Sequence, residues 1–276
     1  MSWHVGAQLY VWMQYCDAKK IRFDDHLATI IAAHRDGGYE GIEGFIELVD
    51  LPPRIERLQK VMAKYQIAEP SFYANSRLHE ADKAKASIEN ILKLAPSARK
   101  VGARFINTNP EPTSWRDGRE KTDDELKVQA EALNELGRRL KSEDLQLVIH
   151  GHAPEFKSDG REMKYNLDNT DPQLVGLCMD THWALRGGAD LFALTRQYAS
   201  RLRTLHLRNS KNGIWSEEFG DGDIDYRKYA ALLREVGFKD GWLFVELAVE
   251  KGTPQTRSLA ESLKISREYV KEVFGV

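Results

Sequence analysis

The chain has 276 residues, of which 42% are hydrophobic and 30% are charged, a composition that favours a packed globular core over disorder. No apolar run approaches the roughly 18 residues needed to cross a bilayer, so the sequence argues against a membrane span. Forty basic residues against 42 acidic ones give a net charge of −2. Without a basic excess we expect no nucleic-acid partner.

The first residues lack the basic and apolar regions of a signal peptide. The two cysteines, Cys16 and Cys178, cannot form a disulfide scaffold and are interpreted as reduced thiols. We therefore expect a cytoplasmic protein.

Eight short runs rich in β-branched and aromatic residues recur along the chain and predict strands. They are residues 4–12, 38–45, 67–74, 103–109, 145–152, 175–182, 202–208 and 241–247. Because each run is too short for a typical helix, the pattern favours strands over buried helical segments.

Segments with apolar residues at helical spacing lie between most of these runs. Helices are expected over 23–35, from Pro52-Pro53 onward, over 81–94, from the capping-box sequence Thr122–Glu125 onward, over 191–198, over 226–236 and from Ser258 onward. After the fifth strand, only Asn169–Leu174 offers a helical turn.

Eight β units followed by helices or loops over about 250 residues predict an α/β fold, a (β/α)₈ TIM barrel. A doubly wound open sheet would normally carry a phosphate-binding glycine fingerprint after an early strand, and this sequence has none. No linker or low-complexity tract interrupts the pattern, so we expect a single domain over 1–276.

Each of the last four predicted strands finishes in a side chain that can bind a metal. These residues are His150, Asp180, His206 and Glu246. Alone, a histidine there is most often an ordinary hydrogen-bonded residue, and Asp180 could simply cap the following turn. Glu246 interrupts the apolar run Phe244–Leu247, where an uncompensated buried carboxylate would cost several kcal/mol. Together the four predict a metal site.

A mixed set of carboxylates and imidazoles suits a divalent metal: Mn²⁺, Co²⁺, Zn²⁺ or Mg²⁺. We expect manganese first, because carboxylate and substrate oxygens are both available as ligands. Substrate oxygens would occupy the remaining coordination positions.

Three segments resemble the sugar isomerase/epimerase superfamily with a xylose isomerase-like barrel: DPQLVGLCMDTHWALRGGAD, LRTLHLRNS and EEFGDGDIDYRKYAALLREVGFKDGWLFVEL. Inosose dehydratases and enzymes of 3-keto-sugars belong to the same group. The resemblance implies a xylose isomerase-like TIM barrel with Asp180, His206 and Glu246 as metal ligands.

The fifth strand departs from that pattern. The superfamily usually places a glutamate at its end, whereas this chain has His150-Gly-His152 followed by Glu155. Which of these three completes the metal site stays open. The His-x-His form resembles the dehydratase and keto-sugar branch.

Further candidates surround these ligands. Glu246 is expected to act as ligand and base together, with His152 or Glu155 as its counterpart in proton transfer. Substrate contacts are expected from Trp183, which could stack on a sugar ring, and from its neighbour His182, together with Arg208 and Asn107. Glu43 could equally be a structural residue of the barrel floor or a substrate contact.

These residues predict a divalent-metal-dependent isomerase or epimerase acting on a keto-sugar or related polyol through an enediolate. The same chemistry could instead eliminate a β-hydroxyl, which would make the protein a lyase of the inosose or 3-keto-sugar dehydratase type. A third hypothesis is that the barrel binds a sugar without catalysing a reaction. A DNA-repair endonuclease is disfavoured by the eight histidines and the absence of a basic excess. The expected partner is a small carbohydrate, and a homo-oligomer is an open alternative.

Overall fold

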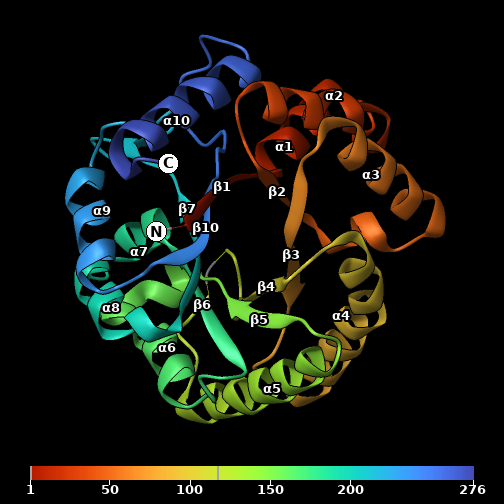
Figure 1. Ribbon diagram of the computed structural model, residues 1–276. Helices are drawn as coiled ribbons and strands as arrows, with labels where there is room; N and C mark the ends of the chain where they lie inside the picture. The colour runs from red at the N-terminus through yellow and green to blue at the C-terminus, as the bar shows by residue number, and fades with distance from the viewer. Residues whose placement is uncertain (1, 117) are drawn as a thin grey trace. The chain divides into compact units, whose positions relative to one another are not determined.

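The principal sheet is a closed barrel of eight strands, whose order is β1-β10-β7-β6-β5-β4-β3-β2. The structure, a computed structural model, describes residues 2–116 and 118–276. The barrel strands are β1 Ser2–Gln8, β2 Gly41–Phe45, β3 Ala68–Ser76, β4 Phe105–Pro110, β5 Gln146–Ile149, β6 Val175–Asp180, β7 Leu202–Leu207 and β10 Asp240–Val245. The prediction of a TIM barrel is confirmed (Figure 1).

Helices separate successive barrel strands. They are α1 Tyr10–Lys19, α2 Phe23–Asp36, α3 Pro52–Tyr65, α4 Ala81–Val101, α5 Asp123–Ser142, α6 Lys157–Asp168, α7 Thr181–Gly187, α8 Leu191–Gln197, α9 Tyr226–Glu235 and α10 Leu259–Phe274. Short 3₁₀ turns occupy Ile46–Val49, Ala153–Phe156 and Ala199–Arg201, and a small hairpin is formed by β8 Ser210–Lys211 and β9 Ile214–Trp215. Within residues 2–116 and 118–276, none of the helices combines the length and apolarity that a bilayer crossing needs.

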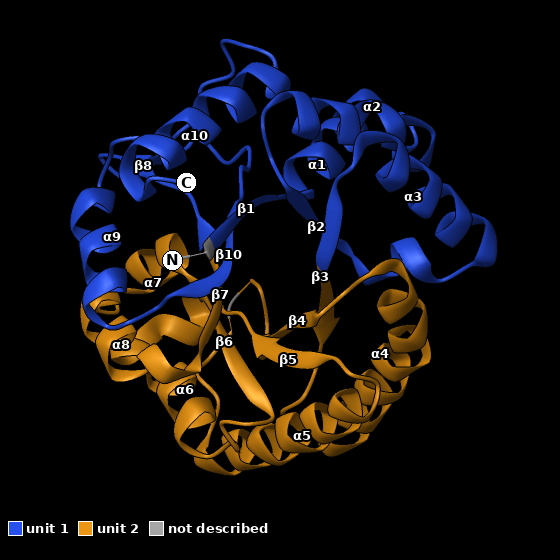
Figure 2. Ribbon diagram, in the orientation of Figure 1, with its two compact units in different colours: residues 1–70, 206–276 blue, residues 71–205 orange. Residues whose placement is uncertain are grey.

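The chain forms two compact units, coloured separately in Figure 2. Unit 1 comprises residues 1–70 and 206–276, and unit 2 comprises residues 71–205. Both boundaries fall inside a strand, one in β3 and one in β7. The expectation of a single domain over 1–276 stays a prediction.

Unit 1 contains the parallel pair β1 and β10, in which Ala7 lies opposite Val245. The hydroxyl of Tyr39 is buried and donates to the carbonyl of Leu263 at 2.8 Å, which ties the end of α2 to α10. Helix α10 begins with a capping box between Ser258 and Glu261. This reciprocal arrangement satisfies backbone donors that the first helical turn leaves without partners.

Unit 2 contains the parallel succession β3, β4, β5 and β6. The predicted capping box of Thr122 and Glu125 starts α5, and a stripe including Leu126, Leu133 and Leu140 is fully buried. The sequence therefore identified this helix and its buried face correctly.

Several sequence-based boundaries were wrong, and one helix was missed. The first strand ends at Gln8 and α1 begins at Tyr10, so the strand predicted over 4–12 runs too far. The sixth strand ends at Asp180, and α7 starts directly after it. Helix α6 was expected only as a turn at Asn169–Leu174. Its buried face includes the polar Glu162 and Asn166, so hydrophobic periodicity does not reveal it.

Candidate metal centre

The ends of β5 and β6 in unit 2 bring one imidazole and one carboxylate together. His150 follows β5 and Asp180 ends β6, and the distance from His150 Nε2 to Asp180 Oδ2 is 3.1 Å. Both side chains are buried. The other oxygen, Asp180 Oδ1, accepts a hydrogen bond from the backbone N–H of Trp183 at 2.7 Å. Asp180 therefore caps α7, which was one of the roles that the sequence suggested for it, and also faces His150.

Aromatic rings surround this pair. The ring of His152 lies edge-on to that of His150, with centroids 4.8 Å apart, and tilted against Trp183 at 5.3 Å. Trp115 contacts His152 edge-on at 5.0 Å, and Tyr73 contacts His150 at 5.7 Å. The sequence singled out His152 and Trp183, and both lie next to the predicted ligands.

Glu155 is a buried carboxyl group beside the His152 backbone. Its Oε2 accepts a hydrogen bond from the backbone N–H of His152 at 2.7 Å. Burial, followed by the charge of Glu162, raises the pKa of Glu155 to about 8, against the opposing influence of Lys121 and the backbone hydrogen bonds. The group is therefore mainly protonated at neutral pH, which suits a proton donor.

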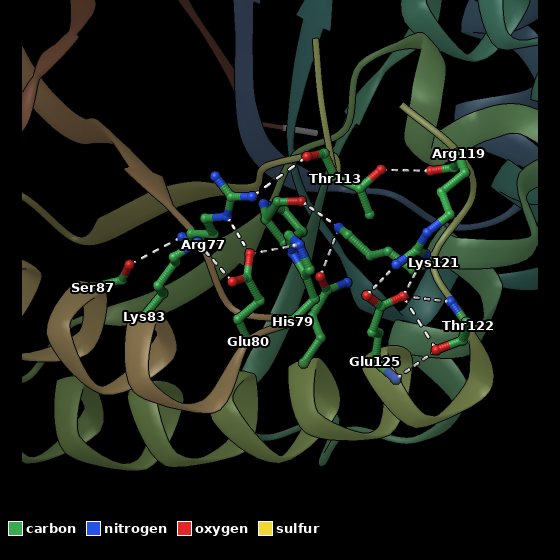
Figure 3. Close-up of polar contacts among 12 residues, drawn as sticks. Arg77, His79, Glu80, Lys83, Ser87, Thr113, Arg119, Lys121, Thr122 and Glu125 are labelled. Atoms are coloured by element: carbon green, nitrogen blue, oxygen red, sulfur yellow. Dashed lines mark hydrogen bonds and ion pairs between the residues drawn. The ribbon is translucent and has the colours of Figure 1, made fainter. Parts of the chain in front are cut away.

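A buried lysine, Lys121, lies close to the carboxyl groups of Glu155 and Glu162. Lys121 Nζ donates to Glu162 Oε1 at 2.6 Å, to Gln129 Oε1 at 2.8 Å and to the carbonyl of Pro110 at 2.8 Å. Three acceptors satisfy the three ammonium hydrogens. Figure 3 shows Lys121 near His79, among the polar contacts that follow β3 and β4. Burial, followed by the charge of Lys121, lowers the pKa of His79 to about 4.

In unit 1, one imidazole lies between two carboxylates. His206 on β7 places Nε2 at 2.5 Å from Glu43 Oε2 on β2, and Nδ1 at 2.6 Å from Glu246 Oε2, just after β10. All three side chains are buried. Arg208 Nη2 lies 3.1 Å from the same Glu246 oxygen.

The structure places the Glu43 carboxylate beside His206. The sequence alone left open whether Glu43 is a structural residue of the barrel floor or a substrate contact. Its carboxylate faces the ring nitrogen of His206 that Glu246 does not face. Carboxylates in this position orient metal-binding histidines in many proteins. Arg208 in turn lies with its guanidinium 4.8 Å from the ring centroid of Trp215, so a cation–π contact accompanies its ion pair.

Sequence reasoning missed Glu69, at the start of β3. Its Oε1 accepts a hydrogen bond from the backbone N–H of Gly44 at 2.6 Å. Burial, followed by the nearby charge of Glu43, raises the pKa of Glu69 well above its ordinary range. A Cβ at Gly44 would lie 3.2 Å from Glu69 Oε1, so a side chain there would crowd this contact. The one available signal was an acidic residue within an otherwise apolar strand.

The predicted ligands lie in two buried pairs, His150 with Asp180 in unit 2 and His206 with Glu246 in unit 1. Each pair combines an imidazole with a carboxylate.

The other predicted residues take different places. Asn107 on β4 is buried, and its Nδ2 lies 3.4 Å from Cys178 Sγ. His182 is buried within the first turn of α7. His4, a polar residue of the first strand, pairs with Glu40 at 2.9 Å and lies opposite Trp242 in the sheet, four positions before the end of β1. Its role is therefore a surface ion pair.

A neutral imidazole carries one N–H and can donate to only one of two flanking carboxylates. The second His206 nitrogen then faces Glu246 acceptor to acceptor, unless a proton or another cation lies there. Two imidazoles and two carboxylates are also a ligand set that divalent ions accept. The residues present therefore fit a divalent metal ion.

A closed parallel barrel with acidic and imidazole groups after its strands defines a TIM-barrel protein, a class that binds ligands at the carboxyl ends of its strands. Residues 31–269 match the family model described as xylose isomerase-like TIM barrel. The chain belongs to this family.

An inosose dehydratase of Clostridium tetani is 28% identical over 169 residues, which cover 55% of each chain. The chain thus spans about half the length of the curated relatives it matches. Among solved structures, an L-ribulose 3-epimerase superimposes with a TM-score of 0.78 at 18% identity, covering 99% of this chain and 95% of that one. The IOLI protein with a bound zinc atom superimposes with a TM-score of 0.72 at 14% identity, covering 99% and 98%. At these identities the solved structures support the fold alone.

Proposed function

We propose that the chain is a divalent-metal-dependent isomerase or epimerase of a keto-sugar or related polyol. The observation that carries the proposal is the pair of buried imidazole–carboxylate contacts after the strands, His150 with Asp180 and His206 with Glu246. In this proposal these four residues hold the metal. Manganese is the first choice, with zinc, cobalt or magnesium as alternatives.

When bound, a divalent ion would polarise the substrate carbonyl and acidify the adjacent C–H. In this proposal Glu246 accepts that proton, and its contacts with Arg208 and His206 orient the carboxylate just after β10. Proton return comes from Glu155, which is mainly protonated at neutral pH, or from His152 beside it. Trp183, His182, Arg208 and Asn107 bind the carbohydrate.

A lyase acting on an inosose or 3-keto-sugar is the second candidate. It is favoured by the inosose dehydratases among the relatives and by His150 at the position where the superfamily usually has glutamate. In this reaction the same base removes the proton, and the β-hydroxyl takes a proton from Glu155 or His152 and leaves as water.

The first test is metal content and binding. The Asp180→Ala variant should lose tight metal binding and turnover, since it removes a ligand. Asp190→Ala is the matched control, because Asp190 caps α8 through the backbone N–H of Ala193 at 2.9 Å much as Asp180 caps α7. Elemental analysis and metal titration of both variants check the prediction. Tight metal binding retained by Asp180→Ala would remove Asp180 from the site.

The second test separates the reactions by product. Metal-loaded protein is incubated with keto-sugars and inososes in D₂O and followed by proton NMR. Deuterium incorporation without mass loss supports the isomerase or epimerase, and loss of water supports the lyase. A pure binding protein would give neither.

A further inference from the structure

Unit 1 contains a cavity of about 680 Å³ outside the proposed metal ligands. It is lined by α1 from Val11 to Lys19, by Glu217, by residues 247–249 that follow β10, and by residues between 253 and 260 at the start of α10. Ligand pockets in proteins typically have volumes of roughly 300–1,000 Å³. The cavity is therefore large enough for a ring-sized group.

The cavity wall is mainly apolar and includes two aromatic rings. Val11, Trp12 and Leu247 contribute buried apolar surface, and Trp12 packs edge-on against Tyr15 with centroids 5.8 Å apart. Trp12 is only 9% exposed, and among the described residues its indole N–H finds no hydrogen-bond acceptor. The wall therefore offers aromatic and aliphatic surface on which a ring with an apolar face can stack.

The cavity lies at the same end of the sheet as the proposed base. Strands β1 and β10 are parallel, with Ala7 opposite Val245, so both carboxyl ends meet at one edge. Glu246 follows that edge, and the next residue, Leu247, already lines the cavity. Burial, followed by the charges of Glu250 and Glu246, raises the pKa of the Tyr10 phenol, and a hydrogen bond from Gln14 opposes this. Tyr10 is thus within electrostatic reach of Glu246 and hydrogen-bonded to Gln14 of the cavity wall.

The cavity is preformed by hydrogen bonds across its wall. The side-chain amide of Gln14 donates to the carbonyl of Val249 at 3.1 Å and accepts from the Val249 backbone N–H at 2.9 Å. The carboxylate of Glu217 accepts from the backbone N–H groups of Thr256 and Arg257 at 2.7 and 2.9 Å. A ligand would therefore bind without first ordering this segment.

We propose that this cavity binds a ring with an apolar face that is joined by a glycosidic bond to the reacting keto-sugar. The proposal rests on the proposed function, because it takes Glu246 as part of the reacting centre. It narrows the substrate class to keto-glycosides, in place of free or phosphorylated monosaccharides. A ring with an apolar face fits the wall better than a phosphate, because most of the wall is apolar and the Arg257 guanidinium pairs with Glu218 at 2.5 Å. Lys19 is the other basic residue of the wall.

The ring could be an aromatic aglycone or a second sugar, since both present an apolar face for stacking. Binding of phenyl β-D-glucoside, cellobiose and methyl β-D-glucoside is measured by calorimetry, with and without added Mn²⁺. We expect phenyl glucoside or cellobiose to bind about tenfold more tightly than methyl glucoside, because burial of the extra ring removes apolar area from water.

Two cavity-filling variants test the location. Ala18→Trp enters the cavity from α1 and Ala260→Trp from α10, and both positions are exposed enough to tolerate the change. Ala63→Trp makes the same substitution on an exposed position of α3 and is the matched control. Both filling variants should lose the preference for the larger ligand, whereas Ala63→Trp should keep it, and all three should bind metal normally.

The proposal is overturned if the wild-type protein shows no preference for either larger ligand, or if both filling variants keep that preference. Preference for phenyl glucoside identifies an aromatic aglycone, and preference for cellobiose identifies a second sugar. These binding measurements do not require turnover. A protein that binds no metal can therefore still prefer the larger ligand, which would contradict the proposed function and leave this inference standing. A protein that binds metal without that preference would contradict this inference alone.

Discussion

The two halves of the proposed ligand group differ in how their charges are balanced. In unit 2, His150 faces a single carboxylate, and the second oxygen of Asp180 already accepts a backbone N–H. In unit 1, His206 lies between Glu43 and Glu246. Unit 2 thus joins one imidazole to one carboxylate, whereas unit 1 joins one imidazole to two carboxylates, with the Arg208 guanidinium at one of them. The comparison indicates that loss of the imidazole should disturb more buried charge in unit 1 than in unit 2.

The largest expected effect separates the two histidines. In metal-free protein, His206→Ala should lower the free energy of unfolding by about 3–5 kcal/mol, because it leaves two buried carboxylates without their shared partner. His150→Ala should cost about 1–3 kcal/mol, the range for one lost buried hydrogen bond. Urea unfolding of both variants measures the difference. Equal losses would contradict the proposed asymmetry.

The second prediction concerns Glu43, which does not belong to the ligand group. Glu43→Gln should weaken metal binding about 10–100-fold, the usual effect of removing the carboxylate that orients a metal-binding histidine. Glu40→Gln, which alters the surface pair with His4, should leave the metal affinity unchanged. Titration with Co²⁺ and its visible spectrum report affinity and ligand geometry together. Indistinguishable affinities of the two variants would make Glu43 only a structural residue.

The third prediction uses pH to examine unit 2. The pKa of Glu155 is about 8 in the folded protein, against about 4.3 in an unfolded chain. Between about pH 4.3 and pH 8, Glu155 is therefore protonated in the folded state and ionised in the unfolded state. The contribution of Glu155 is fully present below about pH 4.3 and is lost as the pH rises toward 8, by at most about 1.4 kcal/mol per pH unit.

Glu155→Gln should flatten this decline, since glutamine keeps an acceptor for the His152 backbone and does not titrate. Urea unfolding between pH 5 and 8 compares it with Glu143→Gln, a change at an exposed position. A wild-type slope retained by Glu155→Gln would assign the decline to other groups.

The fold was predictable because its signals are local. Apolar strand runs, the Thr122–Glu125 capping box and the paired prolines before α3 each act within a few residues, and the structure contains all of them. Helix α6 was missed because Glu162 and Asn166 on its buried face are polar, and their partners Lys121 and Gln129 lie more than 30 residues away in the chain.

The proposed ligands could be selected from the sequence because metal-capable residues interrupt apolar strand ends. The contacts of Glu43 with His206, and of Glu69 with Gly44, could not be derived. They join residues 163 and 25 positions apart in the chain, and a local sequence pattern does not specify such contacts. The cavity beside Leu247 is likewise formed by four separate stretches of the chain.

The position of His206 between two carboxylates also has a calorimetric consequence. A metal ion would bind the deprotonated forms of its ligands, so loading the ion should displace hydrogen ions into the solvent. The apparent heat of association would then vary with the ionisation enthalpy of the buffer. Repeating one titration in phosphate-free buffers of contrasting ionisation heat would count the protons released by this single imidazole and its neighbours.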